Sequence, residues 1–449
     1  MEWNKNKINS ICKIVSSGGT PSRRKKEYYN GTIKWLKTKE LNDANIYETE
    51  EHISEEALRN SSAKIYPKNT IVMAMYGATV GKLGIIKQPM STNQACCCMV
   101  VDEKKADFRY LFYQLIYSRN KLISLANGAA QQNLNSQIIK NYEICIPPLP
   151  IQKKIVHILS TLDEKIELNR KMNETLEAMA QAIFKSWFVD FDPVHAKART
   201  KTKADLETEA KKLGITPEIL ELFPSEFEES EVGMIPKGWE VKKFGTLLSK
   251  TIGGDWGKEE LDHKHTEKVR IIRGTDIPKI KSLSIKDIPT RYVETKKLKN
   301  RELIDGDIII EISGGTKNQP TGRTLYITNE ILEMLNNKVE PASFCRLFRP
   351  INPEVGLILS QHMLHIYDIG KTWQYQNQST GISNFQTTIF LENEKIILPD
   401  KKLQELFFKI VRPLIEKSLS KENIILQQTR DTLLPKLLSG ELDVSEVEI

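Results

Sequence analysis

The 449-residue sequence lacks the features of membrane-spanning and secreted proteins. It has no run of about 18 apolar residues, which a transmembrane helix needs. No apolar stretch follows the polar start at residues 1–7, so we expect no secretory signal. The six cysteines include no CxxC pair, which argues against a zinc or thioredoxin-type site. Three of them, at 96–98, fit a buried strand, and we expect a cytoplasmic protein.

The sequence also lacks the motifs of nucleotide-dependent and DNA-modifying enzymes. Residues 77–83 resemble a phosphate-binding P-loop, but only three residues separate the glycines and a leucine follows the lysine. No GxGxxG, Asn-Pro-Pro-aromatic or Asp-Pro-Pro-aromatic motif occurs. His263 and His265 lie in a charged loop, and the acidic and histidine residues of 190–195 fit packing and capping better than metal binding. We expect neither a catalytic residue nor a metal site.

Positive charge is concentrated in two blocks of the chain. The formal net charge is +7, and Lys+Arg minus Asp+Glu is +8 in residues 1–150 and +4 in residues 235–398. The same difference is −4 in residues 151–234 and −1 in residues 399–449. Basic blocks are typical of proteins that bind nucleic acid, although they also fit a solvated surface.

A long-period repeat relates the two basic blocks. Residues 33–41 resemble 269–277 at an offset of 236, and 66–73 resemble 303–310 at 237. Gly77 then corresponds to Gly314, whereas Asn133 corresponds to Asn384 at an offset of 251. The drift in offset predicts an insertion of about 15 residues in the second half.

Each half ends at a proline-rich break followed by a long amphipathic stretch. In the first stretch, apolar residues recur every seven positions over about five heptads, and Asn169 and Asn173 interrupt the seam. In the second stretch, residues 401–439, Pro413 should kink the helix, Pro435 should end or bend it, and Gly440 is a natural stop. Each helix would span about 57 Å. We expect an antiparallel pair, the alternative being that each helix packs on its own half. The candidate spacer and subunit-interface residues are Leu159, Leu162, Ile166, Asn169, Asn173, Leu176, Ile183 and Trp187.

The alternation of strand-like and helix-like segments predicts an α/β fold class. We expect two similar mixed α/β domains, separated by two long helices that form an antiparallel coiled coil, with a pseudo-twofold internal repeat. The predicted boundaries are 1–148 and 235–398 for the domains, 149–187 and 399–449 for the helices with the C-terminal tail, and 188–234 for a connector. Strands are predicted at 70–75, 84–87, 95–101, 307–312, 324–327 and 344–348, and helices at 108–123 and 356–370.

Six polar, glycine-rich loops lie at matching places in the two halves. Glycine lets backbone N–H groups approach phosphate, Gln and Asn can read adenine edges, and Arg or Lys can read guanine. Any one loop could be a simple turn, but six in register favour DNA contact. The candidates are Gly18, Gly19, Thr20, Lys37, Lys39, Tyr76, Gly77, Thr79, Lys82, Gln131, Gln132 and Asn133, and, in the second half, Gly253, Gly254, Arg273, Gly315, Thr316, Lys317, Gln319, Arg323, Gln374, Gln376, Asn377 and Asn384.

At these segments the sequence resembles the specificity subunits of type I restriction-modification systems. The most specific matches are Phe-Lys-Ser-Trp-Phe-Val-Asp-Phe-Asp-Pro at 184–193 and Ile-Pro-Lys-Gly-Trp at 235–239, although the first half lacks the latter motif. Further segments that carry the resemblance are 17–21, 35–41, 76–84, 133–134, 146–155 and 433–442.

The resemblance implies two target-recognition domains, each of which reads one half of a split double-stranded DNA sequence. It also implies a coiled coil that sets their separation, two DNA methyltransferase subunits as partners and, through them, nuclease/translocase subunits. Those partners would supply the S-adenosylmethionine, ATP and Mg²⁺ chemistry of an adenine-type methyltransferase and an ATP-dependent endonuclease, so this chain itself would bind no cofactor and no membrane.

Three alternatives stay open at the level of sequence. The chain could serve a methyltransferase-only system, or act as a coiled-coil scaffold without base readout. It could also be a stand-alone enzyme on nucleic acid, against which the missing methyltransferase and nuclease motifs argue.

Overall fold

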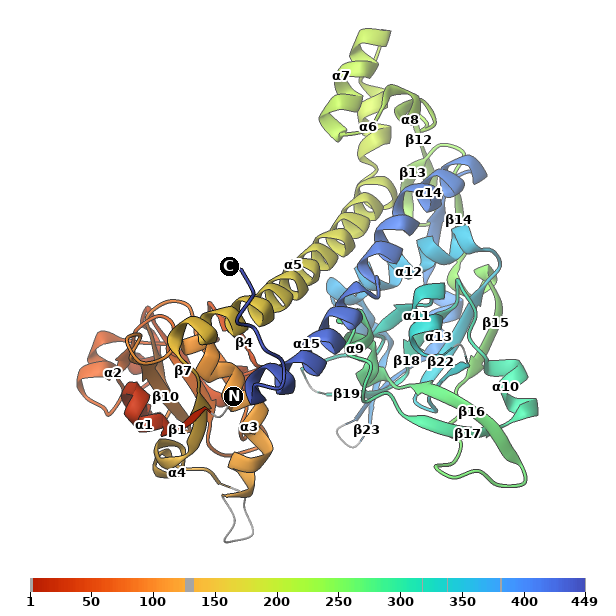
Figure 1. Ribbon diagram of the computed structural model, residues 1–449. Coiled ribbons are helices and arrows are strands. Elements are labelled where there is room, and N and C mark those ends of the chain that lie inside the picture. Colours follow the sequence, from red (N-terminus) through yellow and green to blue (C-terminus); the bar gives the residue numbers. More distant parts are fainter. Residues whose placement is uncertain (1–2, 126–132, 317, 337, 380–381, 449) are drawn as a thin grey trace. The chain divides into compact units, whose positions relative to one another are not determined.

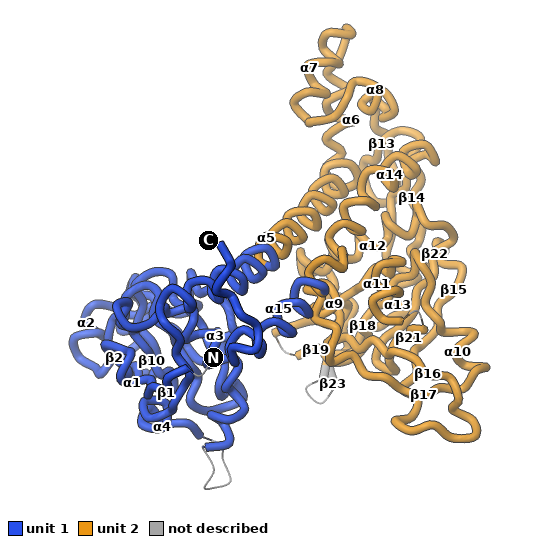
Figure 2. The backbone as a smooth tube through the Cα atoms, viewed as in Figure 1, with its two compact units in different colours: residues 1–166, 425–449 blue, residues 167–424 orange. Residues whose placement is uncertain are grey.

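The computed structural model describes residues 3–125, 133–316, 318–336, 338–379 and 382–448 (Figure 1). The chain forms two compact units (Figure 2). Unit 1 holds residues 1–166 and 425–449, and unit 2 holds residues 167–424. Each unit is a mixed α/β domain that also includes part of each long helix, because the division falls inside α5 (Leu149–Phe188) and α15 (Glu422–Ser439).

The core of unit 1 is a five-stranded sheet. Its order is β2-β10-β7-β8-β4, and β10 carries the three consecutive cysteines, all fully buried as predicted. Burial raises the pKa of the Cys98 thiol to about 12, so this strand is chemically inert packing material. The bounds are β2 (Cys12–Ser17), β4 (Ala44–Ile46), β7 (Ile71–Ala74), β8 (Leu83–Ile86) and β10 (Cys96–Val101).

A second, four-stranded sheet and a small set of helices complete unit 1. The sheet has the order β5-β3-β9-β6, with β3 (Ile33–Leu36) parallel to β9 (Met90–Thr92). Helix α3 (Phe108–Ser124) begins at Asp107, whose carboxylate accepts hydrogen bonds from the first-turn N–H groups. The other elements are β1 (Asn4–Lys7), paired with β11 (Glu143–Ile146), and α1 (Ile8–Ile11), β5 (Glu51–Ile53), α2 (Glu55–Arg59), β6 (Ile65–Tyr66) and α4 (Ser136–Asn141).

Unit 2 repeats the core of this topology, with no described strand in the place of β4 or β6. Its main sheet has the order β15-β22-β18-β20, a second sheet has the order β17-β16-β21, and β14 pairs with β25 as β1 pairs with β11. The bounds are β14 (Glu240–Lys243), β15 (Leu248–Gly253), β16 (His265–Ile272), α9 (Ile277–Lys281), β17 (Thr290–Glu294), α10 (Thr295–Arg301), β18 (Ile308–Glu311), β20 (Thr324–Tyr326), α11 (Asn329–Met334), β21 (Val339–Pro341), β22 (Cys345–Pro350), α12 (Pro353–Asp368), α13 (Thr387–Asn393) and β25 (Lys395–Leu398). The predicted internal repeat is confirmed as a repeat of topology.

The extra residues of unit 2 lie in several loops rather than in one insertion. The offset between matched elements is 241 from Leu83 of β8 to Thr324 of β20, and 249 from Met90 of β9 to Val339 of β21. Helix α11 accounts for part of the second increase. Unit 2 also has a three-stranded sheet of β19 (Ser313–Gly315), β24 (Ile382–Phe385) and β23 (Gln376–Ser379).

The second long stretch is two helices and not one. α14 (Lys401–Ser418) continues through Pro413 and α15 continues through Pro435. The helical conformation is interrupted between the two helices. Pro435 therefore does not end the helix, whereas the kink expected at Pro413 and the bend expected at Pro435 stay predictions. The break occurs at Leu419, whose side chain is buried in a hydrophobic cluster of unit 2 and whose N–H bonds three residues back, to Glu416. Gly440 ends α15 with φ +76°, as predicted.

The helices pack antiparallel within each unit. In unit 2, Phe188 of α5 lies 4.8 Å from Phe407 of α14 between ring centroids, and Asn169 donates to Glu422 at 2.9 Å. In unit 1, Leu434 and Leu437 of α15 share a core with Ile155 and Leu159 of α5. In both units, α5 and its partner helix therefore run in opposite directions.

The connector forms its own small helical cluster. It comprises α6 (Asp192–Ala198), α7 (Lys203–Leu213), α8 (Pro217–Glu221) and the hairpin of β12 (Phe227–Ser230) with β13 (Gly233–Pro236). Asp192 accepts a hydrogen bond from Ser186 at 2.8 Å, and the His195 ring stacks on Phe227 at 4.6 Å, which confirms packing roles for this segment. Across the described residues, no helix is long and apolar enough to span a bilayer.

Candidate nucleic-acid interface

The glycine-rich loops of unit 1 leave its main sheet from a single end. Strand register pairs Ser17 with Cys97, Ala74 with Cys96, and Leu83 with Met73. The loop after β2, the turn between β7 and β8 and the segment before β10 therefore meet at this end, called here the loop end. The opposite end of β10 leads towards α3.

Backbone hydrogen bonds hold these segments together at the loop end. The N–H groups of Gly18 and Gly19 donate to Cys96 and Thr92 at 3.1 and 2.9 Å. Met75 donates to Ala95 at 2.9 Å. A Cβ added at Gly18 would come within 2.3 Å of the Thr92 carbonyl oxygen, so the close approach needs glycine there.

Unit 2 builds its loop end with matching bonds. Gly254 donates to Cys345 at 3.0 Å, as Gly18 does to Cys96 in unit 1. Phe385 donates to Ile312 at 2.9 Å, whereas in unit 1 Leu134 donates to Met75 at 2.7 Å. The predicted loops of each half are therefore brought together in space by the same bonding pattern.

Several predicted base-reading cations are already paired within the protein. Arg323 makes a two-pronged contact with Glu311, and the Arg273 guanidinium contacts Asp276 at 2.7 and 2.9 Å. Lys37 pairs with Glu51 at 2.5 Å. Lys39 pairs with Glu50 at 2.5 Å, and Lys82 with Asp43 at 2.9 Å. A role in DNA reading, which stays a prediction for all of them, would require each cation to keep or exchange its carboxylate partner.

Gln376 is held inside the protein rather than offered to a ligand. Its carboxamide oxygen accepts from Thr321 N–H at 3.2 Å and from the Ser383 hydroxyl at 2.7 Å. Its NH₂ group donates to the carbonyls of Thr321 and Thr372 at 3.1 and 2.9 Å. These bonds fasten the β23–β24 hairpin to the turn between β18 and β20, so Gln376 positions the hairpin.

Other predicted residues do present polar or flexible surface at the loop ends. Gly77 has φ +83° with open space around its Cβ position, and its loop also carries the half-buried Tyr76 and Thr79. Thr20 and Asn384 are half-buried, as are Gly253 and Gly254, and Gly315 is buried. The exposed side chains are Asn133, Thr316, Gln319, Gln374 and Asn377, whereas Gln131, Gln132 and Lys317 lie outside the described residues.

A run of four cations that the sequence motifs do not include lies directly after the first loop. Arg23 is within 4.2 Å of the Tyr29 ring centroid and 4.9 Å of the Trp35 ring centroid, and it pairs with Glu51 at 2.6 Å. The following Arg24, Lys25 and Lys26 are exposed. Four consecutive basic residues so close to Gly18 are a sequence signal for phosphate contact.

Under the loop end of unit 2 lies a buried charged cluster. The Glu340 side chain on β21 is fully buried, and neither carboxylate oxygen has a hydrogen-bond partner among the described residues. Burial and, to a smaller extent, the charge of Asp255 raise its pKa to about 7, and Arg301 and Lys297 oppose the rise. Lys297 pairs with Asp255 at 3.1 Å, and Arg301 donates to the Gly253 carbonyl at 2.9 Å, so the cluster holds the Gly253–Gly254 loop in place.

Comparisons with known proteins agree with this architecture. Residues 1–178 match the family described as type I restriction modification DNA specificity domain. The MjaIX type I restriction enzyme specificity subunit of Methanocaldococcus jannaschii is 28% identical over 466 residues, which cover 99% of this chain and 95% of that protein. The HindI type I restriction enzyme specificity subunit of Haemophilus influenzae is 28% identical over 371 residues, covering 74% of this chain and 77% of that protein.

Among solved structures, the S subunit of a type I restriction-modification system from M. genitalium has the same fold. The TM-score is 0.55 at 17% sequence identity, and the match covers 97% of this chain and 96% of that one.

These observations define the class first: a chain of two domains with one topology, each with a glycine-rich loop end and a share of two long antiparallel helices. Within that class, residues 1–178 match the type I restriction modification DNA specificity domain, and the chain is similar over nearly its whole length to a type I restriction enzyme specificity subunit.

Proposed function

We propose that this chain is the DNA-recognition subunit of a type I restriction-modification complex and reads a two-part DNA target. The observation that carries the proposal is the paired loop ends: two domains of one topology each gather glycine-rich, polar loops at the same end of the sheet. Two such readers in one chain match a target with two half-sites better than a single continuous one.

The chain docks two methyltransferase subunits and, through them, nuclease/translocase subunits, all in the cytoplasm. S-adenosylmethionine, ATP and Mg²⁺ belong to those partners, and the chain supplies no catalytic group. The long helices, with half-exposed seam residues such as Leu162 and Leu176, offer surface for such docking. The same features support a methyltransferase-only complex as the second candidate, since nothing in this chain depends on a nuclease.

Genome-wide methylation mapping with and without this gene tests the proposal. We expect the loss of methylation at one split motif when the gene is deleted, because the recognition subunit directs its methyltransferase partners to that motif. Re-expression of the chain from a plasmid is the control and should restore the motif. An unchanged methylation pattern would contradict DNA recognition and favour a scaffold without base readout.

A further inference from the structure

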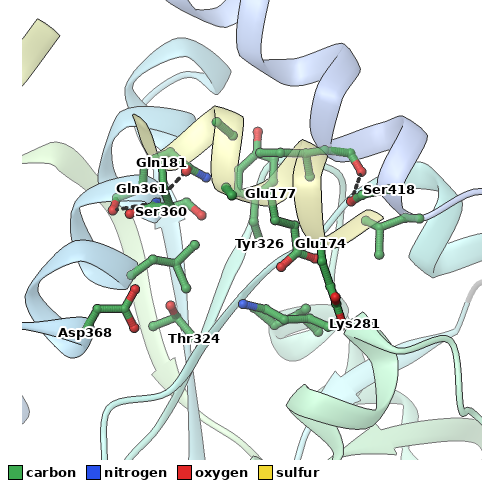
Figure 3. Close-up of a pocket in the computed structure, with 16 residues that line it drawn as sticks. Glu174, Glu177, Gln181, Lys281, Thr324, Tyr326, Ser360, Gln361, Asp368 and Ser418 are labelled. Carbon is green, nitrogen blue, oxygen red and sulfur yellow. Dashed lines mark hydrogen bonds between the residues drawn. The ribbon is translucent and has the colours of Figure 1, made fainter. Parts of the chain in front are cut away.

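Unit 2 contains a cavity where the long helices meet the domain. Its volume is about 560 Å³, and its walls come from α5, α9, β20, α12 and α14 (Figure 3). Leu325, Leu364 and Leu419 contribute apolar lining. The ionic side chains that line it are three carboxylates against one ammonium group, namely Glu174, Glu177, Asp368 and Lys281.

Unit 1 fills the corresponding place with its own arginine. The second half of α5 in unit 2 corresponds to α15 in unit 1. Phe184 of α5 packs on side chains of α14, and Leu434 of α15 packs in the same way on the start of α5, so we match these two residues. Four residues before each of these lie Ala180 in unit 2 and Arg430 in unit 1. Unit 1 therefore carries a guanidinium group at the position where unit 2 has a methyl group on the cavity wall.

The arginine of unit 1 is bound by groups that unit 2 also replaces. Arg430 donates to Asp163 at 2.9 Å, and the Tyr113 hydroxyl donates to the same carboxylate at 2.6 Å. Asp163 lies four residues after the buried Leu159, and the residue four after the matching Val411 is Ile415, which lines the cavity. One ion pair of unit 1 thus corresponds to two apolar side chains and an empty volume in unit 2.

Of the carboxylates that line the cavity, Glu174 already pairs with Arg170 at 2.5 Å, whereas Glu177 does not pair with a cation in the described part of the chain. Glu177 has no hydrogen-bond or ion-pair partner among the described residues, and burial raises its pKa, with Glu174 raising it and Lys281 lowering it. The nearby arginine, Arg412, is already bound to Asp305, Glu416 and the Tyr326 hydroxyl. An added cation would therefore find an uncompensated carboxylate in a partly desolvated site, where charge-assisted hydrogen bonds are strongest.

We propose that this cavity binds the arginine side chain of a protein partner, in the place where unit 1 uses Arg430. The apolar lining accommodates the aliphatic stem, and Glu177 receives the planar guanidinium fork. Resting on the proposed function, we assign the arginine to a methyltransferase subunit. Unit 1 fills the corresponding position with Arg430, so the two units present different surfaces to their partners.

The first test uses ethylguanidinium chloride as the probe on the full chain, with sodium chloride at equal ionic strength as the reference. Saturation-transfer NMR of the ethyl protons measures binding. We expect Glu177→Gln to lower the probe affinity by about tenfold, whereas Glu207→Gln, the same change on the exposed face of α7, leaves it unchanged. Equal affinity in the two variants would overturn the proposal.

The second test measures assembly with the methyltransferase subunit by analytical ultracentrifugation. We expect Glu177→Gln to weaken assembly by about tenfold and Ala180→Arg, which fills the cavity from within, to weaken it as well. Loss of probe binding with unchanged assembly would assign the site to a free organic cation and contradict the partner assignment. Failure of DNA recognition is a separate result, because the probe measurement needs neither DNA nor a methyltransferase.

Discussion

At the scale of single residues, the predicted side chains at the loop ends fall into two groups: those whose charge is already neutralised by a partner within the protein, and those that are not paired in this way. Arg273 and Arg323 fit a base-reading pattern in the sequence, yet each is held in a fork by Asp276 or Glu311. The exposed amide and hydroxyl side chains, such as those of Gln319 and Thr316, form fewer hydrogen bonds and ion pairs within the protein. Sequence alone could not make this distinction, because the carboxylates that pair with the arginines become known only through the fold.

Glu340 gives a residue-scale prediction about pH. Its pKa of about 7 in the folded chain lies above the ordinary value of 4.5, so the folded state holds a proton that the unfolded chain releases. The stability contributed by that proton is complete below about pH 4.5 and is lost as the pH rises through about 7. The loss is at most about 3 kcal/mol.

Glu340→Gln keeps the neutral shape and removes the titration. We expect the variant to be more stable than the parent protein above pH 7 and equal to it below about pH 4.5. Urea unfolding of both proteins across this range, followed by a signal from unit 2, makes the comparison. A stability difference that does not change with pH would show that burial does not control this carboxylate.

At the scale of elements, the sequence predicted what local periodicity encodes and missed what tertiary contacts decide. The strands around residues 71–74, 96–101 and 308–311 and the helix from Phe108 were predicted to within a few residues. The helix break at Leu419 was not, because Pro413 and Pro435 are the local signals for a break while the burial of a leucine sets its position. The internal repeat placed the loops of the two halves in register along the sequence, but their clustering at one end of each sheet became known only from the fold.

The aromatic contact between α5 and α14 gives an element-scale prediction. Phe407 is fully buried against Phe184, Trp187 and Phe188, so Phe407→Ala leaves a large cavity. We expect a loss of about 3–5 kcal/mol, confined to unit 2. Ile155→Ala, the matched change in unit 1, should lower the stability of unit 1 instead.

Hydrogen exchange with mass spectrometry measures both variants, because it reports the opening of each unit separately. Faster exchange in unit 2 with Phe407→Ala and in unit 1 with Ile155→Ala is the expected pair of results. Uniform faster exchange in both units with either variant would contradict the division into two units.

At the scale of the whole molecule, the internal repeat gives two DNA-reading units of one topology. The two units differ in their loops and in their helix packing. Unit 1 has four consecutive cations beside its first loop, whereas unit 2 has the β23–β24 hairpin fastened by Gln376. Unit 1 fills its helix-packing site with Arg430, whereas unit 2 leaves a cavity. Two unequal readers fit two different half-sites, so the recognised sequence should be asymmetric.

The central claim is that each unit reads its own half of a split DNA target. Methylation mapping of loop variants tests it most directly, with Thr79→Ala and Asn133→Ala in unit 1 and Thr316→Ala and Gln319→Ala in unit 2. We predict that each pair changes or relaxes one half of the methylated motif and leaves the other half and the gap between them intact. Changes in both halves from a single pair, or a motif that neither pair affects, would contradict the account.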